Sequence, residues 1–246
     1  EYEEALRVTQ NGVEIARTLS NPTLLFFMLT VLGAVYQAML RLEEARIVLV
    51  ESLALSETIA VRSYQVLSTS RLCANRALAG DWKSAYIYAL KTVTVRNDLE
   101  SSLLFIDFMR YHETEALLRG GDEERAREEV RRLRASIRTN RRLRLSYLRS
   151  QATLLQWDRE TQEAIVSLQE AAVLASEIGL PGELWQVQVA LGDMYTSCGE
   201  REQASQAFSQ AMASVEGLAE KIGDEALRMS FLAEPAVRRV WEQGRA

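Results

Sequence analysis

The side chains that most often do chemistry in proteins are few in this sequence and lie far apart. His112 is the only histidine, and the two cysteines, Cys73 and Cys198, are separated by more than half of the chain. A structural zinc site needs four ligands of this kind close together, so no metal site is predicted. His112 lies in the middle of a helical pattern, which favours a structural or a solvent-facing role. The sequence alone leaves a Ser–His–Asp or Cys–His arrangement open.

Motifs for phosphate binding are absent from the sequence. It contains neither a GxxxxGK[ST] loop nor a GxGxxG segment that follows a strand pattern. The carboxylate pairs Glu43-Glu44 and Glu123-Glu124 stand at expected helix starts, where the helix dipole favours negative charge. We therefore predict no catalytic residue and no cofactor, and we expect that the protein is not an enzyme.

Arginine is concentrated in one segment. Residues 125–149 contain ten Arg and only two acidic residues, Glu128 and Glu129. These arginines could lie on a solvated face, paired with glutamates of neighbouring helices, or they could dock an acidic partner or a phosphate group. The net charge of −5 argues against a general nucleic-acid binder. The basic candidates for partner binding are Arg131, Arg134, Arg138, Arg141, Arg142 and Arg144.

The composition is typical of an all-α protein. Hydrophobic residues make up 48% and charged residues 26%, and only 3 prolines and 12 glycines interrupt the chain. Good helix formers dominate, and alternating runs of β-branched residues are missing.

One helix start recurs along the whole chain at intervals of about 40 residues. Each copy ends in an alanine that follows a small polar or charged cluster, as in GDWKSA and GEREQA. These alanines are Ala5, Ala45, Ala85, Ala126, Ala164 and Ala204. Such a period indicates a solenoid of stacked supersecondary units, because one unit alone cannot bury its apolar face.

The helix before each start repeats as well. Leu32-Gly33 is followed by Tyr36, and Leu191-Gly192 is followed by Tyr195. In both copies the anchor alanine comes nine residues after the tyrosine, and a large apolar residue follows it. The glycine and alanine let two antiparallel helices approach closely. The three middle copies are degenerate, with Cys73, Thr114 and Ala152 at the glycine position and Arg76, Leu117 and Leu155 at the tyrosine position.

These two copies resemble the tetratricopeptide (TPR) pattern, and the period of about 40 residues resembles that of the MalT-like TPR regions of large bacterial signal-transduction ATPases. The tail from Ile222 to Trp241 is similar to the helix that closes such arrays. The resemblance implies an all-α, right-handed superhelical solenoid of antiparallel helix pairs. It also implies a sensor or docking region in a bacterial, cytoplasmic regulator.

We predict one continuous array over residues 1–246, with eleven helices followed by a capping helix. Asn21-Pro22 and Gly179–Gly182 are the clearest breaks, because Pro and Gly interrupt helices. The chain starts inside a helical pattern and therefore looks like part of a longer protein. The expected ranges are 1–19 for the second helix of a truncated pair, 23–57, 60–97, 100–138, 141–178 and 182–220 for helix pairs, and 224–243 for the capping helix.

One stretch has the composition of a membrane segment. Leu24 to Leu40 carries no charge over 17 residues, at the short edge of what a bilayer requires. A helix packed between two others is also apolar nearly all round, and the repeat favours this second interpretation. We predict no membrane association and a cytoplasmic location.

The first helix of each pair lines the concave face in TPR arrays, which gives a second set of partner-binding candidates. Phe26, Phe27, Phe108 and Tyr111 could anchor a peptide or could belong to the core. The candidates by position are Phe27, Thr30, Ala34, Leu67, Ser70, Ala74, Phe108, Tyr111, Glu115, Ser146, Arg149, Thr153, Gln186, Val189 and Asp193.

Taken together, these patterns predict a non-catalytic scaffold that holds a protein or peptide, or another domain of its parent chain. Two alternatives stay open. The first is a self-assembly module, since solenoids stack end to end through exposed terminal faces. The second is a superhelix that binds a small-molecule effector, for which Arg71, Arg110 and Arg149 are candidate anion ligands.

Overall fold

The computed structural model describes residues 2–97 and 110–244, and these residues form thirteen α-helices and no strand. Their contacts divide the chain into two compact units, an N-terminal unit (Tyr2–Arg138) and a C-terminal unit (Thr139–Ala246). Each unit is built from helices joined by short turns. The predicted all-α solenoid of helix pairs is confirmed, while one continuous array over residues 1–246 stays a prediction.

The helix boundaries agree closely with the expected ranges. The N-terminal unit contains α1 (Tyr2–Thr18), α2 (Pro22–Ala38), α3 (Leu42–Ile59), α4 (Arg62–Leu78), α5 (Trp82–Asn97), α6 (Arg110–Arg119) and α7 (Glu123–Ser136). The C-terminal unit contains α8 (Arg141–Trp157), α9 (Thr161–Ile178), α10 (Pro181–Cys198), α11 (Arg201–Glu220), α12 (Glu225–Ala233) and α13 (Pro235–Gly244). The first ten residues of the expected pair 100–138 lie outside the described residues.

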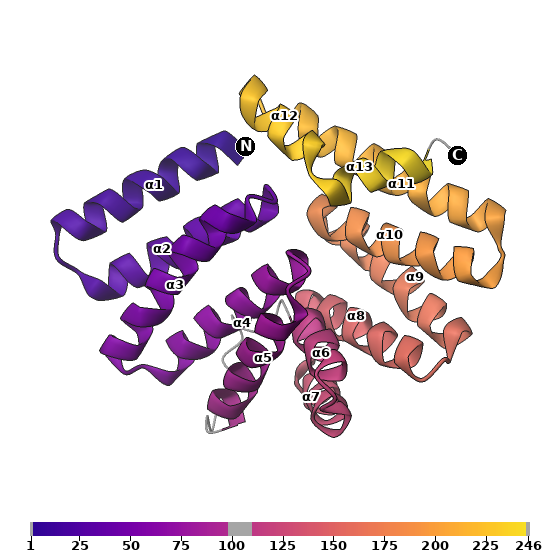
Figure 1. The fold of residues 1–246 in the computed structure, drawn as a ribbon, viewed down its shortest axis with the longest axis horizontal. Helices are drawn as coiled ribbons and strands as arrows, with labels where there is room; N and C mark the ends of the chain where they lie inside the picture. The colour runs from indigo at the N-terminus through magenta and orange to yellow at the C-terminus, as the bar shows by residue number, and fades with distance from the viewer. Residues whose placement is uncertain (1, 98–109, 245–246) are drawn as a thin grey trace. The chain divides into compact units, whose positions relative to one another are not determined.

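Within each unit, successive helices run back and forth and pack against one another (Figure 1). The first helices α2, α4 and α6 also contact each other in turn. Contacts between sequence neighbours are what a solenoid requires, because each pair completes the core of the pair beside it.

The small residues of the repeat lie where helices come closest. Ala45, Ala85, Ala126 and Ala164 are fully buried, and Ala204 is nearly so. A Cβ atom on Gly33 would lie 2.6 Å from the Leu49 side chain. A Cβ atom on Gly192 would lie 2.6 Å from the Phe208 ring. The prediction that these glycines allow close approach within a pair is confirmed.

The backbone repeats more regularly than the sequence does. The turn inside each pair has one residue with positive φ, five positions before the anchor alanine: Leu40 (58°), Gly80 (74°), Gly121 (83°), Arg159 (65°) and Gly199 (77°). In every copy the next residue donates its N–H to the carbonyl of the residue at the tyrosine position, as in Arg41 to Tyr36 (2.9 Å) and Glu200 to Tyr195 (2.9 Å). This is the Schellman ending of a helix. The degenerate middle copies therefore keep the same turn without the same side chains.

The capping segment differs from the expectation of one helix over 224–243. It forms two helices, because α12 ends at Ala233 and α13 begins at Pro235. Glu234 is extended, with φ −60° and ψ 135°. A proline lacks the N–H that continues a helix and disfavours helical geometry in the residue before it. The prediction of a single capping helix was wrong for this reason.

The uncharged stretch Leu24–Leu40 coincides with α2, where Phe26, Leu29 and Leu32 are buried between neighbouring helices. Over residues 2–97 and 110–244, no helix combines the length and the apolar character needed to cross a bilayer. The interpretation of this stretch as a packed helix is confirmed.

Candidate functional site

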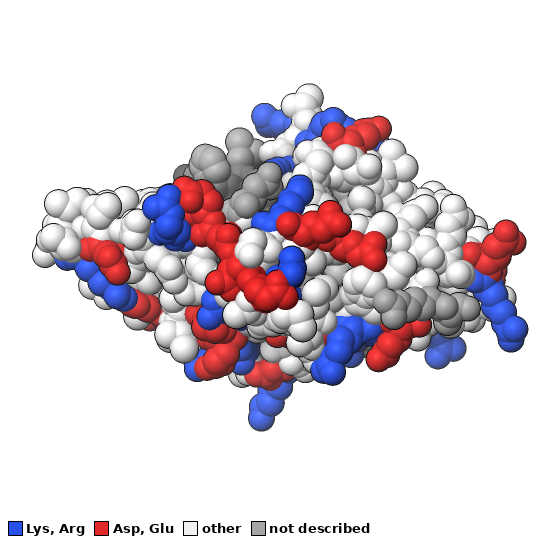
Figure 2. Space-filling view, turned by 90° about the horizontal axis from the view of Figure 1, so that it is seen from above, with Lys and Arg blue, Asp and Glu red and all other residues white. Residues whose placement is uncertain are grey.

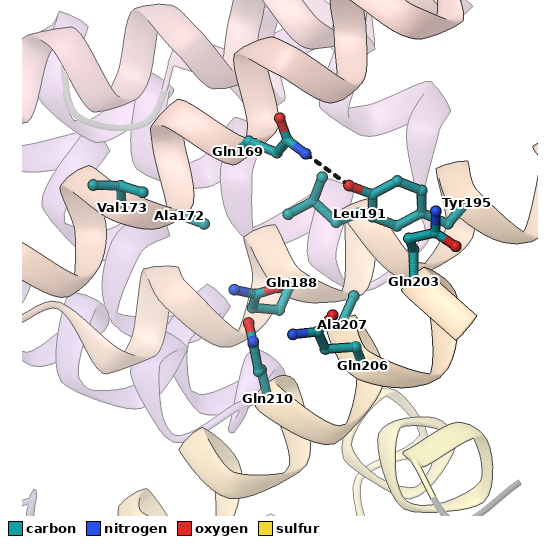
Figure 3. Close-up of a pocket in the computed structure, with 10 residues that line it drawn as sticks. All are labelled: Gln169, Ala172, Val173, Gln188, Leu191, Tyr195, Gln203, Gln206, Ala207 and Gln210. Atoms are coloured by element: carbon teal, nitrogen blue, oxygen red, sulfur yellow. Dashed lines mark hydrogen bonds between the residues drawn. The ribbon is translucent and has the colours of Figure 1, made fainter. Parts of the chain in front are cut away.

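A pocket in the C-terminal unit is lined by five glutamines and no charged residue; we call it the amide pocket (Figure 3). Its volume is about 240 Å³. It lies between the second helices α9 and α11, with α10 behind them. The lining residues are Gln169, Ala172, Val173, Gln188, Leu191, Tyr195, Gln203, Gln206, Ala207 and Gln210.

The side-chain amides of this pocket differ in their hydrogen bonding. The Gln169 side chain donates a hydrogen bond to the Tyr195 hydroxyl at 2.8 Å. Gln188 is only 8% exposed, yet its side-chain amide has no hydrogen bond to any residue that the structure describes. The side chains of Gln206 and Gln210 lie beside Gln188 at the same end of the pocket (Figure 3). The Gln188 amide atoms are not among the fully buried polar atoms that lack a partner, so solvent in the pocket can reach them.

The first-helix candidates of the N-terminal unit are partly used in packing. The Thr30 hydroxyl bonds to that of Ser52 (2.8 Å) and donates to the Phe26 carbonyl (2.8 Å), and all three residues are buried. Ser70 is buried against Glu113. Side chains held inside the unit in this way cannot touch a partner unless the helices separate.

Others on the same helices remain accessible. Phe27 is 38% exposed and lies edge-on to Tyr64, with ring centroids 5.0 Å apart. Leu67 is half-buried, and the half-buried Glu115 pairs with Arg119 at 2.8 Å. Tyr111 is buried, and Phe108 lies outside the described residues.

In the C-terminal unit the first-helix candidates form a polar chain. Arg149 is buried, pairs with Glu183 and donates to Gln186 at 3.1 Å. Asp193 pairs with Arg239 of α13, so the capping segment covers part of this face. Because the Arg149 guanidinium already pairs with the Glu183 carboxylate, Arg149 is a weaker candidate for binding an anionic effector. A partner-binding role for the first-helix face stays a prediction.

The arginine-rich segment is largely charge-compensated. Arg131 pairs with Glu128 at 2.9 Å, Arg141 with Glu177 and Arg144 with Glu170. Acidic and basic side chains lie next to one another on the face that Figure 2 presents. This arrangement agrees with a solvated face of paired charges. Arg134, Arg138 and Arg142 are also exposed, and docking of an acidic partner on these six arginines stays a prediction.

A buried ionic cluster ties four helices of the N-terminal unit together. Arg96 of α5 contacts Glu113 of α6 at 2.9 Å and Glu129 of α7 at 3.0 Å. The Glu113 and Glu129 side chains are only 2% and 4% exposed. Ser70 of α4 donates to Glu113. One guanidinium thus contacts two buried carboxylates, and removing it would leave both of them without this partner in the interior.

The residues with possible chemistry lie apart from one another. His112 is buried, so of its two expected roles the solvent-facing one was wrong. Burial raises the pKa of the Cys73 thiol well above its usual range, and the nearby Glu113 carboxylate adds to this rise. Cys198 is exposed at the end of α10, whereas Cys73 is buried. Among residues 2–97 and 110–244, no three His, Cys, Asp or Glu side chains are grouped to hold a metal ion.

Sequence reasoning missed the amide pocket. A signal was present, because Gln203, Gln206 and Gln210 recur at helical spacing on one face of α11. Their meaning depends on Gln188, which stands where the first repeat copy has Leu29. Only that comparison between copies marks Gln188 as an amide at a core position.

Comparison with known proteins supports the fold assignment but says nothing about the function. No protein-family model matches the chain, and no curated protein matches it. Among solved structures, it is similar to the crystal structure of BtubC (BKLC) from P. vanneervenii, with a TM-score of 0.57 and 18% identity. The match covers 88% of this chain and 92% of BtubC. At this identity the likeness supports a helical-repeat fold and carries no function.

Proposed function

We propose that the protein is a non-catalytic scaffold that holds a protein partner, and that it is a TPR-like, MalT-like sensor or docking region of a larger bacterial, cytoplasmic regulator. The observation that carries the proposal is the fivefold recurrence of one turn geometry, at intervals set by the anchor alanines. Together with the close contacts of Gly33 and Gly192, it supports a chain assembled from TPR-like pairs. Arrays of such pairs offer extended surfaces for partners.

The experiment that tests the proposal is capture of a partner by the purified chain from an extract of the source cells, followed by reconstitution with the purified partner. We expect a defined stoichiometry and a saturable binding curve. Two charge-reversed baits locate the surface: Arg131, Arg134 and Arg138 to Glu in one, and Arg141, Arg142 and Arg144 to Glu in the other. Loss of binding in either places the partner on arginines of that unit. Retention in both places it on the first helices or the amide pocket.

An enzymatic activity of the purified chain that one point substitution abolishes would contradict the proposal. So would failure of every captured protein to bind again when purified, because a scaffold must bind its partner directly.

A self-assembly role is the second candidate, and it has its own observation. Val8 and Ile15 of α1 and Leu19, which directly follows the helix, are seven and four residues apart and are 52%, 56% and 64% exposed. Apolar side chains aligned in this way favour a contact with another helix. Sedimentation of the wild-type chain and of an Ile15→Glu variant tests it. A wild-type monomer at all concentrations would exclude self-association through α1.

A further inference from the structure

Two exposed arginines at the C-terminal end of α7 have no ionic partner among the described residues. The four arginines earlier in this helix each pair with a carboxylate three or four positions before them: Arg125 with Asp122, Arg127 with Glu123, and both Arg131 and Arg132 with Glu128. Arg134 and Arg138 have no carboxylate at those spacings. Neither makes an ion pair or a side-chain hydrogen bond in the part of the chain that the structure describes.

The repeat gives no packing reason for these two charges. Arg134 lies eight residues after its anchor alanine, Ala126. The other copies have apolar residues at this position, all buried or half-buried: Val13, Leu53, Val93, Ala172 and Met212. Arg138 has a φ of 43° in the turn after α7, whereas the turns after α1, α3 and α9 use the uncharged Ser20, Ala60 and Gly179. Uncharged residues would therefore satisfy both positions.

The helix dipole accounts for only part of this charge. The negative end of the dipole favours a cation in the last turn, which suits Arg134. Arg138 lies beyond the last residue of the helix, where this effect has faded. The surplus of positive charge remains after packing, turn geometry and the dipole have been considered.

We propose that Arg131, Arg134 and Arg138 bind a short acidic segment of a protein partner, in which two or three carboxylates lie close together. The planar fork of a guanidinium matches a carboxylate and can hold it through two parallel hydrogen bonds. Arg131 shares the Glu128 carboxylate with Arg132 and is 71% exposed, so it keeps donors for a partner. This inference rests on the proposed function, since it names the chemistry of the partner.

The charges around the three arginines limit what fits there. Arg141 and Arg144 of α8 already pair with Glu177 and Glu170, so the arginines without an acidic partner end at Arg138. The exposed Glu124 lies two turns before Arg131 on α7, and the whole chain has a net charge of −5. A long polyanion, such as a nucleic acid, would meet this negative charge. A short acidic segment gains the local attraction without extending that far.

Two short peptides test the inference directly. They are acetyl-Ala-Glu-Ala-Glu-Ala-amide and its match with Gln in place of Glu, so that only the first carries carboxylates. Each is titrated at constant ionic strength into the ¹⁵N-labelled chain, and the Nε–Hε signals of Arg134 and Arg138 are followed by NMR. The variants Arg134→Lys and Arg138→Lys assign these signals. We expect saturable shifts with the Glu peptide and binding of the Gln peptide weaker by about fivefold or more.

Two double variants supply the controls. Arg134→Glu with Arg138→Glu should fold, because both side chains are exposed, and should weaken binding of the Glu peptide about tenfold or more. Arg159→Glu with Arg201→Glu makes the same change in net charge at two exposed arginines of the C-terminal unit and should leave binding unchanged. Equal loss in this second variant would show that only the overall charge matters and would overturn the inference.

Inorganic phosphate and a thymidine oligonucleotide, titrated in the same way, separate an acidic protein segment from other anions. Binding of either one as tight as that of the Glu peptide would assign the arginines to phosphate groups and overturn the inference. Equal binding of the two peptides, or no shift with the Glu peptide, would also overturn it.

Failure here is distinguishable from failure of the proposed function. A purified partner that binds equally to the wild type and to the Arg134→Glu, Arg138→Glu variant would leave the scaffold intact and remove only the acidic-segment assignment.

Discussion

The first repeat copy (α1–α3) and the last (α9–α11) share the same contacts between helices but differ in the side chains around those contacts. Both have the glycine beneath a large apolar side chain. Both also join a glutamine of the preceding helix to the tyrosine hydroxyl, Gln10 to Tyr36 at 3.1 Å and Gln169 to Tyr195 at 2.8 Å. Equivalent residues in the two copies are 159 positions apart, as 195 minus 36 shows. The shared contacts are therefore properties of the repeat.

The differences lie around the shared tyrosine. Where the last copy has Gln188, Gln206 and Gln210, the first has Leu29, Ile47 and Glu51. Glu51 pairs with Arg17 at 2.9 Å, and Leu29 fills the core. The comparison teaches that the repeat fixes helix packing and leaves the side chains between second helices free to differ, with a charged pair in the first copy and an amide pocket in the last.

The large apolar residue beneath the glycine should have the greatest effect on stability. Phe208→Ala should cost about 3–5 kcal/mol and Leu49→Ala about 2–5 kcal/mol, because both side chains are buried and would leave cavities. Native-state amide hydrogen exchange would measure the loss separately in α10–α11 and in α2–α3. A loss below about 1 kcal/mol in either copy would mean that the Gly–apolar contact does not hold that pair together.

Replacing Leu29 with Gln and, separately, Gln188 with Leu should change the stability of the chain in opposite directions. Leu29→Gln places an amide in the first core and should cost about 1–3 kcal/mol. Gln188→Leu removes an unpartnered amide and should be neutral or stabilising. Chemical denaturation of each single variant checks the signs. Clear destabilisation by Gln188→Leu would show that its amide is satisfied in the folded chain and would break the contrast between the copies.

Substitutions in the turn inside each pair should have the next largest effect on stability. Gly199 has φ of 77°, and Gly199→Ala should cost about 1–2 kcal/mol because a Cβ is unfavourable in the left-handed region. Arg159 adopts the same conformation with φ of 65° and is exposed, so Arg159→Gly should stabilise by about 1 kcal/mol. Thermal unfolding would record the two shifts in opposite directions. Shifts of the same sign would indicate that the turns are not equivalent.

The hydroxyl of the shared tyrosine should make the smallest of these contributions to stability. Tyr36→Phe and Tyr195→Phe each remove one hydrogen bond and should cost about 0.5–1 kcal/mol. Tyr36 should show the larger loss, because it is buried while Tyr195 is half-buried. Denaturant midpoints of the two variants measure the difference. A larger cost for Tyr195→Phe would show that the Gln169–Tyr195 bond supports the amide pocket more than its exposure suggests.

The sequence by itself determined the helices, their pairing and the close contacts of Gly33 and Gly192. These follow from local patterns, since apolar periodicity, helix starts and small residues act over one or two turns of helix. It also contained Pro235, whose effect on the capping helix was overlooked. A partner-binding role for the arginines and for the first-helix residues follows from composition and position alone and stays a prediction.

The tertiary structure decided what depends on neighbours distant in sequence. It placed Leu40 and Arg159 in the left-handed turns that glycine occupies in the other copies, although neither residue favours that conformation. It buried Arg96 between two carboxylates from two later helices, and it placed Gln188 at the edge of a pocket that also includes glutamines of α9 and α11. Burial and hydrogen bonding are set by side chains from several helices at once, and no pattern within one helix contains that information.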